Sequence, residues 1–86
     1  MHERALMDDL VCKVLEVAAA EQATAVTRIR VRLGALSHFT PGHFREHWVN
    51  ATLGTLAEGS EVDATLDDDA AAAAAQGVVL ESVEVR

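Results

Sequence analysis

The chain has 86 residues, half of them apolar, which is enough for one small domain with a core but not for two. It has 14 acidic and 7 basic residues and a formal net charge of −7, which argues against a nucleic-acid-binding protein, since such domains carry a basic face. No run approaches the roughly 20 apolar residues of a membrane span, the N-terminus lacks a signal-peptide pattern, and a single cysteine cannot form an internal disulfide. We therefore expect a cytoplasmic single-domain protein with no nucleic-acid or membrane partner.

The first predicted element is a helix over residues 5–20. Its apolar residues recur at the three- and four-residue intervals of a helix with one buried face. They are Leu6, Leu10, Val11, Val14, Leu15, Val17 and Ala18. Cys12 lies within the same helix, and because a free cysteine behaves as a small apolar residue, we expect its side chain to be buried.

Residues 25–33 alternate between apolar and charged side chains, which predicts a strand with one face on the core and one facing water. The inward positions are Thr27, Ile29, Val31 and Leu33. The outward positions are Arg28, Arg30 and Arg32, and two interpretations of this arginine row remain open. The arginines can form a docking surface for an acidic partner. They can instead pair across the sheet with the outward-facing acids Glu61, Asp63 or Glu84.

A second helix is predicted from the sequence that follows Thr40. Thr40 suits the N-cap position, and Pro41 suits the first helical position. The apolar residues Phe44, Trp48 and Ala51 then recur at helical spacing, and Gly54 provides a C-terminal stop. We expect Trp48 to belong to the core.

Two histidines of this helix, His43 and His47, lie one turn apart on a shared face. Together with Glu46 they match the His-x-x-Glu-His pattern of one metallopeptidase class. A five-residue match without a third ligand or a large scaffold does not support peptidase activity. A solvated helix surface is the simpler interpretation, and an auxiliary metal site is the alternative, because two imidazoles one turn apart can chelate an ion.

Two further strands are predicted at residues 60–66 and 78–85, where Val62, Ala64, Leu66, Val83 and Val85 alternate with polar residues and face inward. The order α-β-α-β-β predicts an α+β fold with two helices packed on one face of a three-stranded sheet. Residues 67–77, three aspartates and six alanines followed by Gln-Gly, are interpreted as a long hairpin connector between the last two strands.

The residues with the clearest metal-binding potential stand at the start of the chain. Because His2 is bulky, we expect Met1 to be retained. The Met1 amine, the His2 backbone nitrogen and the His2 imidazole can then close a five-membered and a six-membered chelate ring on one metal ion, and the Glu3 amide can supply a further nitrogen. Nitrogen ligands in a plane favour Ni(II) or Cu(II), whereas zinc prefers a tetrahedral set.

Met1-His2-Glu3 followed by an amphipathic helix resembles the opening of the hydrogenase nickel-incorporation metallochaperones, the HypA/HybF family. The likeness continues through residues 26–37, which are similar to the family's strand and its Gly-x-Leu-Ser turn. It includes residues 54–59, similar to the family's Gly-Thr-x-x-Glu-Gly connection, and residues 79–85, which resemble its closing strand.

This resemblance implies a nickel metallochaperone, not an enzyme, that binds Ni(II) at its N-terminus and delivers it for [NiFe]-hydrogenase maturation. It implies a nickel-handling maturation GTPase and the hydrogenase large subunit as partners, and a homodimer is a further option. It also makes His38, in the loop before the second helix, a candidate to approach the nickel. The alternative function is an adaptor or regulatory interaction module without metal delivery.

The chain departs from the family pattern between the last two strands. The family normally carries a zinc ribbon there with two Cys-x-x-Cys pairs, whereas residues 67–77 contain no cysteine. A four-cysteine zinc site cannot form in this sequence, so no zinc is expected. We interpret residues 1–86 as a single nickel-binding domain in which residues 67–77 are a short connector in place of the zinc ribbon.

Overall fold

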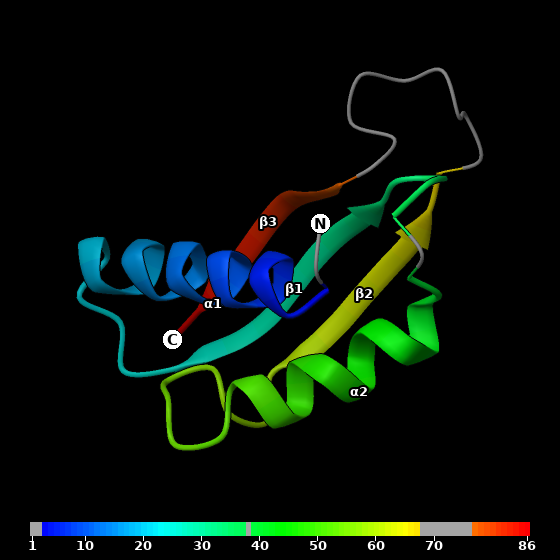
Figure 1. Cartoon of the computed structure of the whole chain (residues 1–86). Helices are drawn as coiled ribbons and strands as arrows, with labels where there is room; N and C mark the ends of the chain where they lie inside the picture. The colour runs from blue at the N-terminus through cyan, green and yellow to red at the C-terminus, as the bar shows by residue number, and fades with distance from the viewer. Residues whose placement is uncertain (1–2, 38, 68–76) are drawn as a thin grey trace.

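The computed structural model describes residues 3–37, 39–67 and 77–86, and it confirms the predicted α+β fold. Two helices and three strands follow one another as α1 (Glu3–Ala20), β1 (Val26–Leu33), α2 (Pro41–Ala51), β2 (Glu61–Leu66) and β3 (Val78–Val85). Figure 1 shows α1 over β1 and β3, with α2 alongside β2. Both helices therefore pack on the same face of the sheet. Among the described residues, no helix is long and apolar enough to cross a membrane.

The central strand of the sheet is β1, with β2 parallel to it on one side and β3 antiparallel on the other. The interpretation of residues 67–77 as a hairpin connector is therefore wrong, because β2 and β3 are not neighbours. Residues 67–77 are instead a crossover connection between two strands that flank β1, and the ends of these strands lie about 10 Å apart for two strand spacings. Both sides of this crossover are tied to the end of β1, by Asp67 N–H donating to Leu33 O (2.8 Å) and Gly34 N–H donating to Gly77 O (2.9 Å).

The core lies between the inner face of β1 and the two helices. Its buried apolar residues come from α1, from β1 and from α2 with its flanking loops. They are Met7, Leu10, Val11, Val14, Ala18, Val26, Ile29, Val31, Leu33, Phe39, Phe44, Trp48 and Ala57. Trp48 is fully buried, as predicted, and its indole N–H donates to Ser60 Oγ at 2.8 Å, so its one polar atom is satisfied inside the core.

The alternation of β1 is interrupted near its start. Val26 and Ile29 are both buried although they are three residues apart, and Thr27 is only half-buried. The register with β3 shifts between Val26 and Arg28. An irregularity of this kind adds a residue to one strand and resets which side faces inward, which explains why Thr27 does not take the predicted core position.

Three apolar positions predicted to face inward are exposed. Val17 and Leu66 have exposed fractions of 40% and 51%, and Cys12 is also exposed. Successive helical residues are rotated by about 100°, so Leu10 and Val14 lie only about 40° apart around the helix axis, whereas Cys12 lies about 160° from Leu10. The prediction of a buried Cys12 is therefore wrong because the cysteine projects away from the buried face of α1.

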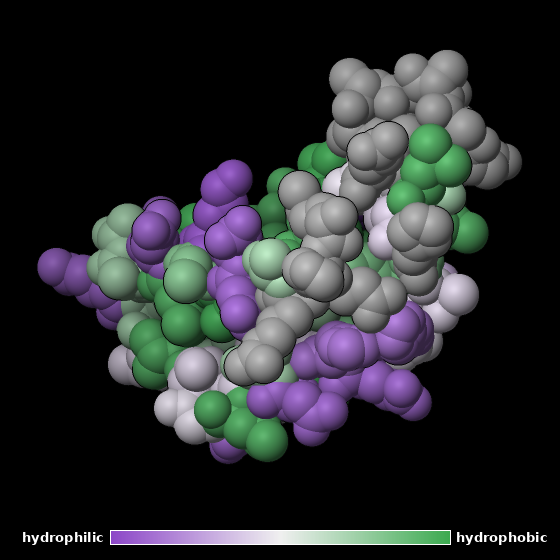
Figure 2. Space-filling model, in the orientation of Figure 1, coloured by the Kyte–Doolittle hydropathy of each residue, from purple (hydrophilic) through white to green (hydrophobic). Residues whose placement is uncertain are grey.

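In Figure 2, hydrophilic and apolar residues are mixed over α1, hydrophilic residues gather over α2, and apolar residues lie at the turn that follows α2. Three exposed apolar residues lie at this end of the molecule: Val49, Leu53 and Leu56. The chain turns here through Gly54, whose φ of +79° lies in the left-handed region that glycine adopts without steric cost.

Candidate metal site

Of the predicted nickel ligands, the structure describes only the backbone of Glu3. Met1, His2 and His38 lie outside the described residues, and Glu3 is the first residue of α1. The first four N–H groups of an α-helix have no partner within the helix. The Glu3 backbone nitrogen is therefore not engaged in the hydrogen bonds of α1.

The histidines of α2 form a close pair. The Nε2 atoms of His43 and His47 are 2.9 Å apart, so one imidazole donates an N–H to the other. Both side chains are half-buried. The ring of Phe39 lies beside the pair, with centroids 5.7 Å from His43 and 6.1 Å from His47. The two imidazole nitrogens thus lie in contact with each other beside the Phe39 ring.

The first turn of α2 is fixed by its N-terminal residues. Thr40 is in an extended conformation and its hydroxyl accepts a hydrogen bond from His43 N–H at 3.2 Å, with Pro41 at the helix start. Phe39, before the cap, packs edge-on against Phe44 at a centroid distance of 5.5 Å. This contact between the residue before the cap and the fourth helical residue is a hydrophobic staple. Sequence reasoning missed Phe39, although the pattern Phe-Thr-Pro-x-x-Phe carries the signal.

We expect Thr40→Ala to lower the free energy of unfolding by about 1 kcal/mol, because it removes the acceptor for the His43 N–H. For a domain of this size, that loss corresponds to a Tm decrease of roughly 4–8 °C, measured by thermal unfolding followed by circular dichroism. Thr40→Ser keeps the hydroxyl and serves as the control, with a Tm near that of the wild type. An unchanged Tm in Thr40→Ala would show that the cap does not hold the first turn.

The His-x-x-Glu-His pattern does not assemble a larger site in the part of the chain that the structure describes. Glu46 is exposed, while His43 and His47 are half-buried beside Phe39. Within residues 3–37, 39–67 and 77–86, no three side chains of His, Cys, Asp or Glu converge as a metal-binding group. What the described residues offer is a pair of imidazoles.

The arginine row lies on the outer face of the sheet and is paired across it. Arg28 contacts Glu61 at 2.6 Å and Glu84 at 3.9 Å, and Arg30 contacts Asp63 at 3.4 Å. Of the two interpretations that the sequence left open, pairing across the sheet is confirmed for these residues. The hydrogen bond with Glu61, helped by the negative charges of Glu61 and Glu84, raises the pKa of the Arg28 guanidinium.

Arg32 completes the row with contacts to Glu81 at 2.7 Å and to Asp67 at 4.0 Å. Its hydrogen bond with Glu81 and the negative charge of that residue raise the pKa of Arg32. Asp67 and Glu81 come from the chain on either side of the crossover. Exposed ion pairs of this kind contribute little to stability, so the row mainly neutralises the outer face.

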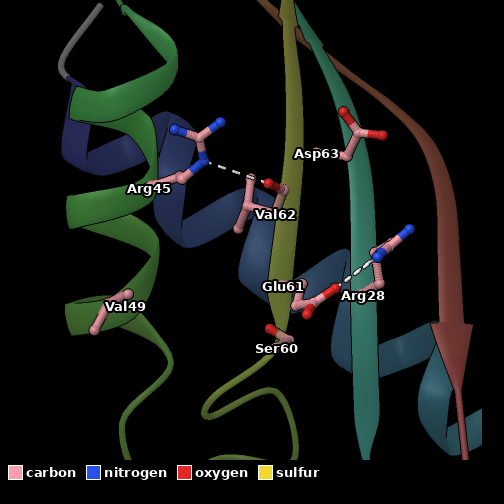
Figure 3. A pocket seen from close by; sticks show the side chains of 7 residues that line it. All are labelled: Arg28, Arg45, Val49, Ser60, Glu61, Val62 and Asp63. Atoms are coloured by element: carbon pink, nitrogen blue, oxygen red, sulfur yellow. Dashed lines mark hydrogen bonds and ion pairs between the residues drawn. The ribbon is translucent and has the colours of Figure 1, made fainter.

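A groove with a volume of about 490 Å3 separates α2 from β2 on this side of the molecule. In Figure 3, Arg45 of α2 points across the groove and its Nε donates to the Val62 carbonyl oxygen at 3.4 Å. Two arginines and two carboxylates line it, Arg28 and Arg45 with Glu61 and Asp63, so their charges balance. The described residues of its lining include no histidine or cysteine, the ligands that would favour Ni(II) or Cu(II), and the carboxylates Glu61 and Asp63 are paired with arginines.

Comparison with known proteins decides the family. The family model described as hydrogenase/urease nickel incorporation, metallochaperone, hypA matches residues 1–82. This chain belongs to the HypA family. The match includes Met1-His2-Glu3, both helices and most of the sheet.

Two HypA hydrogenase maturation factors are similar in sequence. One, from Archaeoglobus fulgidus, is 33% identical over 67 residues, which cover 78% of this chain and 61% of the relative. The other, from Methylocella silvestris, is 38% identical over 63 residues, which cover 73% of this chain and 56% of the relative. The matched part of this HypA-family chain therefore spans less than two thirds of the length of either relative.

The fold is also shared with a solved structure of the family. The solution structure of the Ni metallochaperone HypA from Helicobacter pylori superposes with a TM-score of 0.76, and the match covers 99% of this chain and 97% of that chain. At 18% sequence identity this likeness shows the common fold. It agrees with the α-β-α-β-β order described above.

Proposed function

We propose that this protein is a nickel carrier that binds Ni(II) through Met1, His2 and Glu3 and delivers it for [NiFe]-hydrogenase maturation. The observation that carries the proposal is the match to the nickel-incorporation family over residues 1–82, which includes the predicted chelate. The protein acts in the cytoplasm as a carrier and not as an enzyme. Its partners are a nickel-handling GTPase and the hydrogenase large subunit, with a homodimer as a further assembly.

The start of α1 supports this chelate chemically. The Met1 amine, the His2 nitrogen and the His2 imidazole occupy three corners of a square plane. The Glu3 nitrogen is free of helical hydrogen bonds and can approach the ion from outside that plane, next to the His2 nitrogen. A helix N-terminus also carries a partial positive charge, which disfavours a bound cation. A planar chelate at this position combines specific capture with ready release, as a carrier requires.

The same proposal assigns two other parts of the chain. Residues 67–77 serve as a connector in place of a zinc ribbon, so the protein carries no zinc. Arg28, Arg30 and Arg32 provide contacts for a partner on the outer face of the sheet. Because each arginine is paired with an acid, a partner has to exchange these pairs for its own carboxylates. His38 remains a candidate to approach the nickel.

Nickel titration by calorimetry tests the chelate. We expect His2→Gln to lose the tight nickel site, because the imidazole and with it the six-membered ring are removed. Glu3→Pro removes the backbone N–H at a helix position that proline tolerates, so nickel affinity falls while the fold remains. Glu3→Gln keeps the N–H and is the matched control, with wild-type affinity.

Retention of the tight nickel site in His2→Gln would contradict the chelate. Delivery is tested separately, by whether the wild-type protein restores active hydrogenase in cells that lack their own family member. Failure of the wild type to restore hydrogenase, while it binds nickel normally, would favour the adaptor alternative.

A further inference from the structure

The distance between the two imidazole nitrogens of α2 can be compared with the distance between neighbouring ligands on a metal ion. A metal ion binds imidazole nitrogen at about 2.0–2.1 Å. Two such bonds at a right angle place the nitrogens about 2.9 Å apart, and a tetrahedral angle places them about 3.3 Å apart. The His43 and His47 Nε2 atoms are 2.9 Å apart. They already lie at the spacing of adjacent ligands in a square-planar or octahedral complex.

We propose that His43 and His47 form a second metal site, a two-imidazole chelate on α2 for Ni(II) or Cu(II). Both ions accept nitrogen ligands at right angles, and the affinity of a nitrogen site rises from nickel to copper. Among the residues that the structure describes, no third His, Cys, Asp or Glu joins the two imidazoles as a metal-binding group, and water can fill further positions on the ion. Its two ligands are not among those of the nickel chelate proposed at Met1, His2 and Glu3, so this proposal does not depend on that one.

Binding at this site requires little reorganisation of the protein. The cap at Thr40 fixes the first turn of α2, and Phe44 and Trp48 anchor the helix in the core. The ring of Phe39 restricts both imidazoles from one side. In the metal-free protein, one Nε2 carries the proton that it donates to the other. On metal binding that proton moves to Nδ1 of the same ring, so both Nε2 atoms become ligands without a net loss of protons.

The two sites differ in how they couple to folding. Met1, His2 and Glu3 are consecutive, so an unfolded chain offers the same chelate, and nickel binding there does not stabilise the fold. His43 and His47 come together only when α2 is helical. A ligand that binds only the folded state raises the Tm, by roughly 10–20 °C at a free concentration 100 times the Kd for a domain of this size.

The experiment uses the full chain with the His2→Gln substitution, which removes the proposed terminal chelate. Thermal unfolding followed by circular dichroism is measured with increasing NiCl2 and, in parallel, CuCl2. We expect a concentration-dependent rise in Tm that is lost when His47→Gln or His43→Gln is added. Affinity measured by calorimetry should fall by about tenfold or more, because the second bond is no longer intramolecular. Glu46→Gln, an exposed change on the same helix, is the control and should keep the rise.

A nickel-dependent rise in Tm that persists in both histidine variants overturns the proposal. The proposal is also overturned if nickel does not raise the Tm of the His2→Gln protein. A larger shift with ZnCl2 than with NiCl2 overturns the assignment to right-angle coordination. Should a histidine variant fail to fold, broadening of the His43 and His47 ring proton signals by Cu(II), which is paramagnetic in both geometries, gives the same decision in the His2→Gln protein. The His2→Gln protein lacks the terminal chelate, so a negative result for His43 and His47 does not contradict the proposed nickel carrier function. Equally, a negative result for the terminal chelate does not contradict the site at His43 and His47.

Discussion

Acetylation of the Met1 amine is expected to abolish tight nickel binding while leaving the fold unchanged. An acetylated nitrogen is an amide, which binds nickel only after it loses its proton. Without a terminal amine to anchor the ion, the ring to the His2 nitrogen is not expected to close. All side chains, including His2, remain in place. Calorimetric nickel titration of the acetylated protein measures the effect, and circular dichroism confirms that α1 is retained. Wild-type affinity after acetylation would rule out the chelate and move nickel binding to His38, His43 or His47.

A glycine added before Met1 provides a control with an opposite outcome. In Gly-Met-His the histidine is third, so an amine, two amide nitrogens and an imidazole form a complete square plane. We expect nickel binding to survive this addition, with slower release. A longer N-terminal tag places the amine far from His2 and should prevent binding. Together, these variants separate a requirement for the amine from a general sensitivity of the N-terminus.

Trp48→Ala is expected to produce the largest loss of stability. Trp48 is fully buried and donates to Ser60, so the substitution leaves a large cavity and removes one of the two hydrogen bonds of the Ser60 hydroxyl, which still donates to Ala57 O. Truncation of a buried aromatic residue costs about 3–5 kcal/mol, a large part of the roughly 5–15 kcal/mol by which small domains are stable. Chemical denaturation gives the free energy of unfolding, and we expect the Tm to fall by more than about 10 °C.

Two variants show which part of this loss comes from packing. Val49→Ala changes the next residue of α2, which is 56% exposed, and should alter stability by no more than about 0.5 kcal/mol. Ser60→Ala removes the acceptor of the indole N–H and should cost about 1–3 kcal/mol, because a buried donor is left without a partner. A loss below about 1 kcal/mol for Trp48→Ala would show that α2 is not anchored through this residue.

Local patterns of the sequence predicted the elements, because each depends on residues close together in the chain. The alternation around Arg30 identified β1, and Thr40 with Pro41 identified the start of α2. The order of the strands could not be predicted in this way. The pairing of β1 with β2 is parallel and joins residues such as Arg28 and Glu61 across a whole helix, so neither strand's own pattern contains it.

The candidate site was predictable only in part. The spacing of His43 and His47 places them on one face of a helix, and this can be derived from sequence. The distance of 2.9 Å between their Nε2 atoms also depends on the side-chain conformations of the two histidines, which pack against Phe39. Phe39 belongs to the loop before the helix, so the helical spacing does not contain this contact. Cys12 is the opposite case, since helical periodicity alone would have placed it on the exposed side of α1.

The crossover between β2 and β3 also has a consequence for how this domain can be extended. Its two ends are fixed independently by backbone hydrogen bonds, Asp67 to Leu33 and Gly77 to Gly34. The free energy of closing a flexible loop rises by only about 0.6 kcal/mol for each doubling of its length. A separately folded module whose own termini lie about 10 Å apart, the width of two strand spacings, could therefore be inserted here without disturbing the sheet. The end of β1 thus provides a natural insertion point at which such a module could be gained or lost as a unit.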